Sequence, residues 1–319
     1  MTSIPGAPDS RAIIALALAE DLGVPVDVFL ADASSPIGAA PLVDVLGRDV
    51  TSSAVIPADA VFEGRIVARE QAVVCGLPVA GRVWSTLARA AGADPEALEV
   101  FPLVAEGARV DAGTAVAEVA GPARIVLAGE RTALDFVMVL SGIATEAARW
   151  QTAAGPDVAV CDTRKTWPGL RALSKYAVRV GGATNHRAGL WDMVLVKDNH
   201  VRAAGGVESA VAVARSLHPE LAVEVEAESI RAAVAGATAG ADIVLLDNMG
   251  DAALRDAVAA VAEVVRTTGR ACLTEASGGI TYARLESLRD TGVDRISSSA
   301  ITFAPPIDFG FDEVTQPLD

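Results

Sequence analysis

The sequence predicts an α/β protein with two domains: an N-terminal α+β sandwich domain over residues 1–130, and an incomplete parallel α/β barrel over residues 131–302. Two observations predict this fold class. Residues 61–127 contain short β-branched stretches separated by glycine, with a helical stretch between them, which is typical of antiparallel strands packed on a helix. From about residue 130 onward, short apolar strands alternate with alanine-rich helices, which indicates a parallel sheet.

In the N-terminal domain, the apolar part of residues 1–23 predicts an ordinary helix that ends in acidic residues. The following segment, residues 24–47, is poorly periodic and predicts an irregular excursion. Glycine-punctuated, β-branched patterns predict strands, and an amphipathic pattern predicts a helix at 77–93. The strand stretches are 61–74, 108–121 and 123–129, and the C-terminal tail, residues 303–319, is expected to rejoin this domain.

In the second domain, a long amphipathic helix is expected over residues 129–153. Six short apolar runs follow, and each ends in a polar or charged residue. In a closed α/β barrel such strand ends converge on one mouth, where active sites lie, whereas an open sheet would spread them along an edge. Six strands instead of eight predict an incomplete barrel. The runs are 158–162, 192–198, 221–226, 242–247, 271–275 and 293–297.

The charge of the chain is unevenly distributed. The formal net charge is −15, which argues against nucleic acid and anionic membrane as partners, because both require a basic surface. Residues 164–202, the basic island, contain eight Lys or Arg and two Asp, a local charge of +6 that leaves −21 for the remainder. All three lysines of the chain lie in this island, which predicts a binding site for an anionic small molecule.

Compartment is indicated by cysteine usage and hydropathy. No apolar run approaches the roughly 18–20 residues that span a bilayer, and the N-terminus lacks the basic region of a signal peptide. Cys75, Cys161 and Cys272 lie far apart and form no CxxC pair, so neither a zinc ribbon nor a disulfide framework is supported. We therefore expect a cytoplasmic protein.

The strand ends place two opposed sets of side chains at the predicted mouth. Cationic side chains bind carboxylates or phosphates, with arginine offering bidentate geometry and lysine a point charge. Carboxylates suit ribose hydroxyls, a magnesium ion or a developing cation. The cationic set is Arg164, Lys165, His186, Arg187 and Lys197, and the acidic set is Glu226 and Asp247, with Glu275 nearby.

A glycine-bearing turn follows the strand at 271–275. Ser277, Gly278 and Gly279 are expected to open a helix, so that free backbone N–H groups and a helix N-terminus face a phosphate. As the penultimate loop of a barrel, this turn falls near the usual phosphate position.

Seven motifs follow one another along the chain. The first three are ERTALDFVMVLSGIAT (130–145), DTRKTWPGLRALSKYAVRVGGATNHR (162–187) and VKDNH (196–200). VEVEAES (223–229), VLLDNM (244–249), EASGGI (275–280) and GVDRIS (292–297) continue the series in order. Together they resemble the quinolinate phosphoribosyltransferase family, also called carboxylating nicotinate-nucleotide pyrophosphorylases. The resemblance covers roughly residues 48–319, and it implies an enzyme that acts on quinolinate and phosphoribosyl pyrophosphate, assembled at least as a homodimer.

The resemblance also implies a role for each matching residue. Arg164, His186, Arg187 and Lys197 would bind the pyridine dicarboxylate, together with Arg131 from the neighbouring subunit. Lys165 would contact phosphoribosyl pyrophosphate. Glu226 and Asp247 would bind its ribose hydroxyls or a magnesium ion, directly or through the substrate. The 5′-phosphate would lie at Ser277, Gly278, Gly279 and Ser299.

Four positions depart from the family pattern. Ser299 replaces an expected glycine and Phe303 an expected histidine in ISSSAITF (296–303). Asp135 stands where the family usually has Asn, and Trp167 where Thr is common. These departures leave open a relative that ribosylates a different pyridine or azole carboxylate. The sequence is also compatible with a Schiff-base lyase that uses Lys197, or with a non-catalytic sensor of phosphoribosyl compounds.

Overall fold

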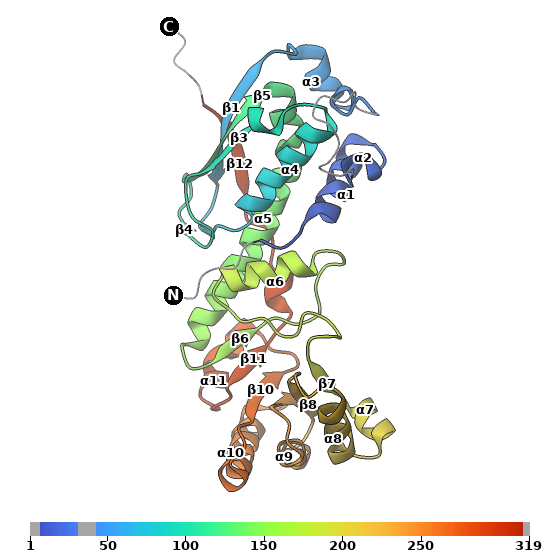
Figure 1. Ribbon diagram of the computed structural model, residues 1–319. Helices are drawn as coiled ribbons and strands as arrows, with labels where there is room; N and C mark the ends of the chain where they lie inside the picture. Colours follow the sequence, from blue (N-terminus) through green and yellow to red (C-terminus); the bar gives the residue numbers. More distant parts are fainter. Residues whose placement is uncertain (1–6, 31–42, 315–319) are drawn as a thin grey trace. The chain divides into compact units, whose positions relative to one another are not determined.

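The protein is described from a computed structural model that covers residues 7–30 and 43–314. The chain forms two compact units (Figure 1). The first unit comprises the described residues of Met1–Thr145, Ala172–Gly181 and Ala304–Asp319, and the second comprises Glu146–Arg171 and Gly182–Phe303. Residues 31–42 of the predicted irregular excursion and residues 315–319 of the tail lie outside the described residues.

The first unit contains a four-stranded antiparallel sheet in the order β12-β1-β5-β3. Its strands are β1 (Val61–Ala68), β3 (Glu99–Pro102), β5 (Ala115–Pro122) and β12 (Phe309–Glu313). A two-stranded ribbon joins β2 (Ala72–Val73) to β4 (Arg109–Val110). Because β12 pairs with β1, the last strand of the chain completes the sheet of the first unit.

Four helices and two short 3₁₀ turns precede or interrupt this sheet. In α4, apolar residues four positions apart lie on one face of the helix and are buried: Val79, Val83 and Leu87. The fully buried Trp84 donates its indole N–H to the Val126 carbonyl at 3.0 Å. The helix α1 ends at Gly23, whose φ of 62° is readily adopted by glycine. The helices are α1 (Arg11–Leu22), α2 (Asp27–Leu30), α3 (Val50–Val55) and α4 (Leu77–Ala90), and the turns are η1 (Leu46–Arg48) and η2 (Pro95–Ala97).

The prediction of a strand at 123–129 is wrong. These residues are the first two turns of α5 (Ala123–Ala154), in which Ile125 and Val126 are buried. A helix that already extends over 130–154 gains one backbone hydrogen bond for each residue added to its end, so β-branched residues are tolerated there. This one helix contributes to both units, and the first unit continues to Thr145, beyond the boundary expected at residue 130.

The second unit is built on six parallel strands in the order β6-β11-β10-β9-β8-β7. From β7 to β11 each strand pairs with the next strand in the chain, and β11 then pairs with β6. The strands β6 and β7, both of which the structure describes, do not pair with each other. The structure therefore has the parallel sheet of an α/β barrel that is left open at one junction. The strands are β6 (Ala159–Cys161), β7 (Val194–Val196), β8 (Val223–Ala227), β9 (Ile243–Asp247), β10 (Leu273–Ser277) and β11 (Arg295–Ser297).

Helices cover one face of this sheet. Residues Val225 and Val244 are buried, and both lie against Gly236 of α9, where an added Cβ would approach Val225 to 3.2 Å. The helix α9 is capped at both ends. At its N-terminus the Ser229 hydroxyl accepts a hydrogen bond from the Ala232 N–H at 3.2 Å, and at its C-terminus Gly240 has a φ of 96°. The helices are α7 (Asp198–Ala204), α8 (Val207–Leu217), α9 (Ile230–Ala239), α10 (Asp251–Thr268) and α11 (Leu285–Arg289), with η3 (Tyr282–Arg284) and η4 (Ala300–Phe303).

The helix α6 (Arg171–Val180) lies in the chain between β6 and β7, but residues 172–181 belong to the first unit. The basic island is therefore divided: Lys175 and Arg179 are not among the side chains that the second unit brings together. Among the described residues, no helix combines the length and the apolar character needed to cross a membrane.

Candidate active site

The register of the parallel strands gathers polar side chains on the sheet face opposite the one that packs on α9. Glu226 and Glu275 are both neighbours of Leu245 in the ladder, and Arg295 is the neighbour of Glu275. Because side chains alternate along a strand and match across it, Glu224 shares this face with Glu226. Asp247 and Ser277, which pair with each other at the carboxyl ends of β9 and β10, lie on the same face.

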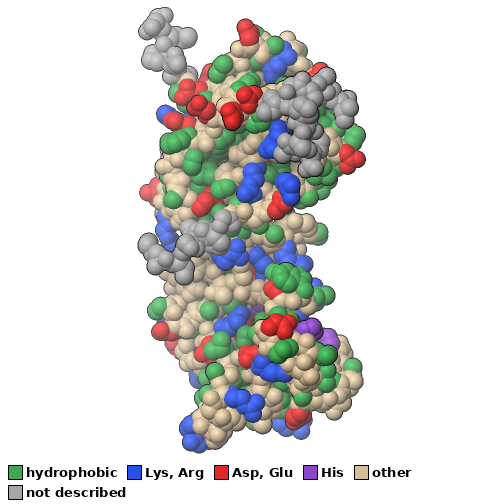
Figure 2. Space-filling model, in the orientation of Figure 1, with side chains coloured by type: hydrophobic (Ala, Val, Ile, Leu, Met, Phe, Trp, Pro, Cys, Tyr) green, Lys and Arg blue, Asp and Glu red, His purple; other side chains and the backbone are tan. Residues whose placement is uncertain are grey.

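At the mouth formed by these strand ends, Lys197 and Glu226 form an ion pair between β7 and β8. The Lys197 backbone N–H donates to His200 Nδ1 at 2.9 Å, which holds the start of α7 beside the strand end. Lys197 is about half exposed and Glu226 is mostly buried. The structure thus brings a predicted cationic residue and a predicted acidic residue into direct contact. On the face shown in Figure 2, basic, acidic and histidine side chains of this unit lie interspersed.

The loop after β9 packs tightly on the predicted phosphate turn. Asn248 has a φ of 55°, the only positive φ at a non-glycine residue in the described part of the chain. Its side-chain amide donates to Asp247 Oδ2 at 2.7 Å, and its backbone N–H donates to the Ser277 carbonyl at 3.0 Å. These bonds fix the Asp247 carboxylate next to the turn that begins at Ser277.

The turn itself adopts a conformation that requires glycine. Gly278 and Gly279 have φ values of 88° and 59°. A Cβ on Gly278 would lie 2.3 Å from Asn248 Oδ1, whereas a Cβ on Gly279 would meet nothing within 4 Å. Beside the turn lies a hollow of about 520 Å³, lined by Asn248, Met249, Gly250, Asp251, Gly278, Gly279 and Arg284. The prediction that Ser277, Gly278 and Gly279 open a helix is wrong, because Ser277 is the last residue of β10 and the next helical residues begin only at Tyr282, in the 3₁₀ turn η3.

The loop after β6 carries the predicted Arg164 and Lys165. Arg164 Nε is buried and makes no hydrogen bond within the residues that the structure describes. The Lys165 carbonyl accepts a hydrogen bond from Thr302 Oγ1 at 2.8 Å, so the loop is tied to η4, which follows β11. Thr302 Oγ1 also lies 2.9 Å from the Ser299 carbonyl.

Arg187 lies close to Arg164. The pKa of Arg187 is lowered, first by burial and next by the positive charge of Arg164, with Glu224 and Asp192 opposing the shift. Arg187 Nη1 donates to the Met193 carbonyl at 3.3 Å. Two partly buried guanidinium groups of like charge are a favourable environment for an anion, because an anion relieves their repulsion.

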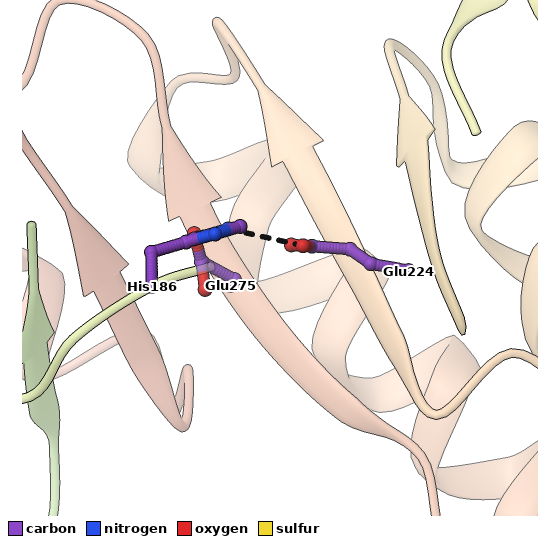
Figure 3. Close-up of side chains that lie close together, drawn as sticks. All are labelled: His186, Glu224 and Glu275. Carbon is purple, nitrogen blue, oxygen red and sulfur yellow. Dashed lines mark ion pairs between the residues drawn. The ribbon is translucent and has the colours of Figure 1, made fainter. Parts of the chain in front are cut away.

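His186 lies in a buried cluster with two carboxylates (Figure 3). Its Nε2 lies 3.0 Å from Glu224 Oε2 and 3.5 Å from Glu275 Oε1, and its side chain is 7% exposed, while both glutamates are fully buried. Arg295 Nε lies 2.9 Å from Glu275 Oε2. Among the described residues, these three are the only His, Cys, Asp and Glu side chains whose ligand atoms are close enough to hold a metal together.

The titration of this cluster follows from its burial. Burial raises the pKa of Glu275, and the charge of Glu224 raises it further against the opposing charges of His186 and Arg295. Burial lowers the pKa of His186, but the interaction with Glu224 and the charge of Glu275 outweigh it, so this pKa is raised overall. Both shifts mean that the cluster retains a proton at higher pH than the separate groups would.

Sequence reasoning missed Glu224 and Arg295 as members of the site. Glu224 stands in the alternating stretch VEVE, where its spacing of two from Glu226 puts both on one face of β8. A charged residue inside a buried strand is the signal that could have identified both residues, because such residues are rarely buried without partners.

Three of the four departures make contacts, two of them with each other. The rings of Trp167 and Phe303 pack edge to face, with centroids 5.3 Å apart and planes at 90°. Ser299 has no positive φ, so a side chain there causes no backbone strain. In the first unit, Asp135 accepts from the exposed Arg131 at 3.3 Å, one helical turn apart on α5.

An open α/β barrel with cationic and acidic side chains at the carboxyl ends of its strands has the architecture of an α/β-barrel enzyme, in which active sites lie at those ends. Residues 143–312 match the family Quinolinate phosphoribosyl transferase, C-terminal domain, and residues 49–141 match its N-terminal domain. The chain belongs to the quinolinate phosphoribosyltransferase family, as its motifs led us to expect.

Its relatives include proteins from distant organisms. The probable carboxylating nicotinate-nucleotide pyrophosphorylase of Synechocystis is 44% identical over 77% of this chain and 81% of its own length. The carboxylating enzyme of Mycobacterium leprae is 40% identical over 83% and 91%. Among solved structures, NadC from Streptococcus pyogenes superposes with a TM-score of 0.80 at 33% identity, covering 98% of this chain and all of that one.

Proposed function

We propose that this protein transfers the phosphoribosyl group of phosphoribosyl pyrophosphate to quinolinate and decarboxylates the product. The products are nicotinate mononucleotide, pyrophosphate and carbon dioxide. The observation that carries the proposal is the proximity of Arg164 and Arg187, two partly buried guanidinium groups at the barrel mouth, of which Arg164 Nε makes no hydrogen bond within the described residues. The names of the relatives support the same activity.

In this reaction, the dicarboxylate binds to the cationic side of the mouth. Arg164 and Arg187 suit one or both carboxylates, because a guanidinium presents a planar fork to a carboxylate. Lys197 adds a point charge, and its ion pair with Glu226 holds its ammonium group at the mouth. A substrate held at two carboxylates has its ring nitrogen fixed in direction, which is the alignment that displacement at C1 of the ribose needs.

The phosphoribosyl donor binds to Lys165 and to the acidic side of the mouth. When pyrophosphate leaves C1 of the ribose with the bonding electron pair, a positive charge develops at that carbon, and the carboxylates of Glu226 and Asp247 stabilise it. The ring nitrogen supplies its lone pair to form the new C–N bond. The nitrogen is then positively charged, so the ring accepts the electron pair of the adjacent C–CO₂ bond, carbon dioxide leaves, and a proton takes its place.

The donor set at the mouth fits a magnesium ion bound together with substrate. Mg²⁺ in such sites uses one or two protein carboxylates and takes its other ligands from phosphates and water. Glu226 and Asp247 supply two carboxylates at neighbouring strand ends, and both already have hydrogen-bonding or ionic partners that hold them in place. The ion would neutralise charge on the pyrophosphate. Ser277, Gly278, Gly279 and Ser299 would bind the 5′-phosphate.

The proposal includes a homodimer of cytoplasmic location in which Arg131 of one copy completes the site of the other. Arg131 is exposed on α5 and its ion pair with Asp135 is a surface pair, which is easily exchanged for a stronger anion. Cys75, Cys161 and Cys272 are free thiols, as expected in a reducing compartment.

The test is direct. The protein is incubated with quinolinate, phosphoribosyl pyrophosphate and Mg²⁺, and nicotinate mononucleotide and pyrophosphate are measured; absence of product refutes the proposal. Lys165→Ala and Arg187→Ala should abolish turnover while the circular dichroism spectrum stays native, because each removes a charge at the mouth. Wild-type rates in either variant would contradict the assignment of these residues.

A second candidate function is ribosylation of a different pyridine or azole carboxylate. The contact between Trp167 and Phe303 favours it, because two of the departures from the family pattern occur at neighbouring positions and build an exposed aromatic pair beside the Lys165 loop. A panel of carboxylated pyridines and azoles distinguishes the two candidates: the substrate with the highest kcat/KM identifies the function.

A further inference from the structure

We propose that Glu224 and Glu275 are positioning residues that act through the ring of His186 to place Arg187 for binding the substrate carboxylate. This inference rests on the proposed function, since it assumes that Arg187 binds quinolinate. It assigns His186 to the support of the site, whereas the family resemblance implies direct contact between His186 and the dicarboxylate.

The first observation is that both ring nitrogens of His186 are engaged inside the protein. Nδ1 accepts a hydrogen bond from the Arg187 backbone N–H at 2.8 Å, so Nδ1 carries no hydrogen when the ring is neutral. The ring hydrogen is therefore on Nε2, which faces Glu224 Oε2 at 3.0 Å and Glu275 Oε1 at 3.5 Å. A ring in this state has no N–H left to offer to a substrate carboxylate.

The second observation is that one of the carboxylates lies within ion-pair distance of a guanidinium, although none of the four oxygens of the two carboxylates makes a hydrogen bond of good geometry within the described residues. Glu275 faces Arg295 Nε at 2.9 Å, and Arg295 Nη2 lies 3.3 Å from Cys161 Sγ. The cluster thereby joins side chains of β6, β8, β10 and β11 to the segment that carries His186 and Arg187. The positive charge of Arg295 partly offsets the charge of the two buried carboxylates.

The third observation is that the backbone at Arg187 is fixed from both sides. On the preceding side, the buried Asp162 accepts from the His186 backbone N–H at 2.8 Å and from Asn185 Nδ2 at 2.7 Å. On the other side, Asp192 accepts from the backbone N–H groups of Ala188 and Gly189 at 2.6 and 2.9 Å. The N–H of Arg187 itself is held only by the His186 ring among the hydrogen bonds described, so the ring fixes the backbone from which the Arg187 side chain extends. The Arg187 guanidinium has one further contact, from Nη1 to the Met193 carbonyl at 3.3 Å.

Two substitutions of His186 divide its functions. Asn places a polar atom near Nδ1 and retains an acceptor for the Arg187 N–H, but it loses the contact with the glutamates. Gln places its amide nitrogen near Nε2 and retains a donor to the glutamates, but it loses the acceptor for Arg187. If the ring transmits position from one side to the other, each substitution weakens quinolinate binding.

The experiment measures dissociation constants for quinolinate and for phosphoribosyl pyrophosphate by calorimetry in Glu275→Gln, Glu224→Gln, His186→Asn and His186→Gln. Thr274→Val is the matched control, because Thr274 precedes Glu275 on β10, is similarly buried and loses a 2.8 Å hydrogen bond to Asp294. We expect the site variants to weaken quinolinate binding about tenfold or more, as for a lost hydrogen bond to a charged group. Binding of phosphoribosyl pyrophosphate should change less than about threefold in all variants.

A double variant tests whether the residues act through one another. In Glu275→Gln with His186→Asn, the loss of quinolinate affinity should be no larger than in His186→Asn alone, because the path is already broken. Additive losses would overturn the inference, as would unchanged quinolinate binding in both glutamate variants or equal losses for the two substrates. If Glu275→Gln does not fold, Glu224→Gln carries the same comparison. If the wild-type protein binds no quinolinate, the proposed function itself fails.

Discussion

Replacing Gly278 by alanine tests whether the turn after β10 is built around Asn248. In the structure, Gly278 has a φ of 88°, and a Cβ at this position would lie 2.3 Å from Asn248 Oδ1 and 2.8 Å from the Asn248 backbone N. The neighbouring Gly279 has a φ of 59° and open space where its Cβ would be. Gly279→Ala is therefore a matched control that adds the same methyl group one residue away.

The expected magnitudes differ because only one of the two substitutions creates a clash. A non-glycine residue with positive φ costs about 1–2 kcal/mol, and both variants bear this cost. Gly278→Ala also forces Asn248 to move, and overpacking of this kind costs about 1–3 kcal/mol more. We expect the free energy of unfolding to fall by about 2–5 kcal/mol in Gly278→Ala and by about 1–2 kcal/mol in Gly279→Ala.

Urea denaturation followed by circular dichroism measures both values, and the dissociation constant of phosphoribosyl pyrophosphate is measured on the same samples. Movement of Asn248 displaces the amide that holds Asp247, so Gly278→Ala should also weaken binding of this substrate. Equal losses of stability in the two variants would refute the reasoning, since they would mean that the contact with Asn248 does not constrain the turn.

Three further predictions use the same structure. Asp135→Asn should strengthen quinolinate binding up to about twofold by releasing Arg131 from a surface ion pair, and calorimetry showing weaker binding would contradict this. Phe303→Ala should lower the free energy of unfolding by about 0.5–1.5 kcal/mol and shift tryptophan emission to the red, because the ring beside Trp167 is removed; an unchanged spectrum would exclude the contact. The pKa of His186 is raised in the folded state, so the contribution of its protonation to stability should be complete below its unfolded pKa of about 6.5 and be lost as pH rises through the folded pKa. The free energy of unfolding, measured across this pH range, should therefore depend less on pH in His186→Asn than in the wild type. In Thr274→Val the pH dependence should be unchanged.

The sequence was sufficient to predict the six barrel strands, because each lies in a short apolar run next to a polar or charged residue. β9, for example, ends at Asp247, and Asp162 follows β6. It was not sufficient at 123–129, where β-branched residues suggested a strand but the helix behind them extended its hydrogen bonding through the segment. β3 was also missed, since its four residues are largely exposed and carry no alternating pattern.

For the site, charge type and strand position predicted which residues gather, but not what each one touches. The contact of Lys197 with Glu226 and the enclosure of His186 by Glu224 and Glu275 depend on the register between strands that are far apart in the chain. Register is set by tertiary packing, and no local pattern around His186 reports it.

The pairing of the last strands with the first has a consequence for how the chain folds. β12 pairs with β1, and β11 pairs with β6, so each sheet joins strands that lie more than a hundred residues apart. Closing such distant pairs slows folding, because the entropy of the intervening chain is lost before the contact stabilises it. During synthesis β1 and β6 keep unpaired edges until the final strands emerge from the ribosome, and such edges are prone to aggregation. A chain interrupted before Phe309 would retain the whole barrel mouth and still expose the edge of β1 in the first unit.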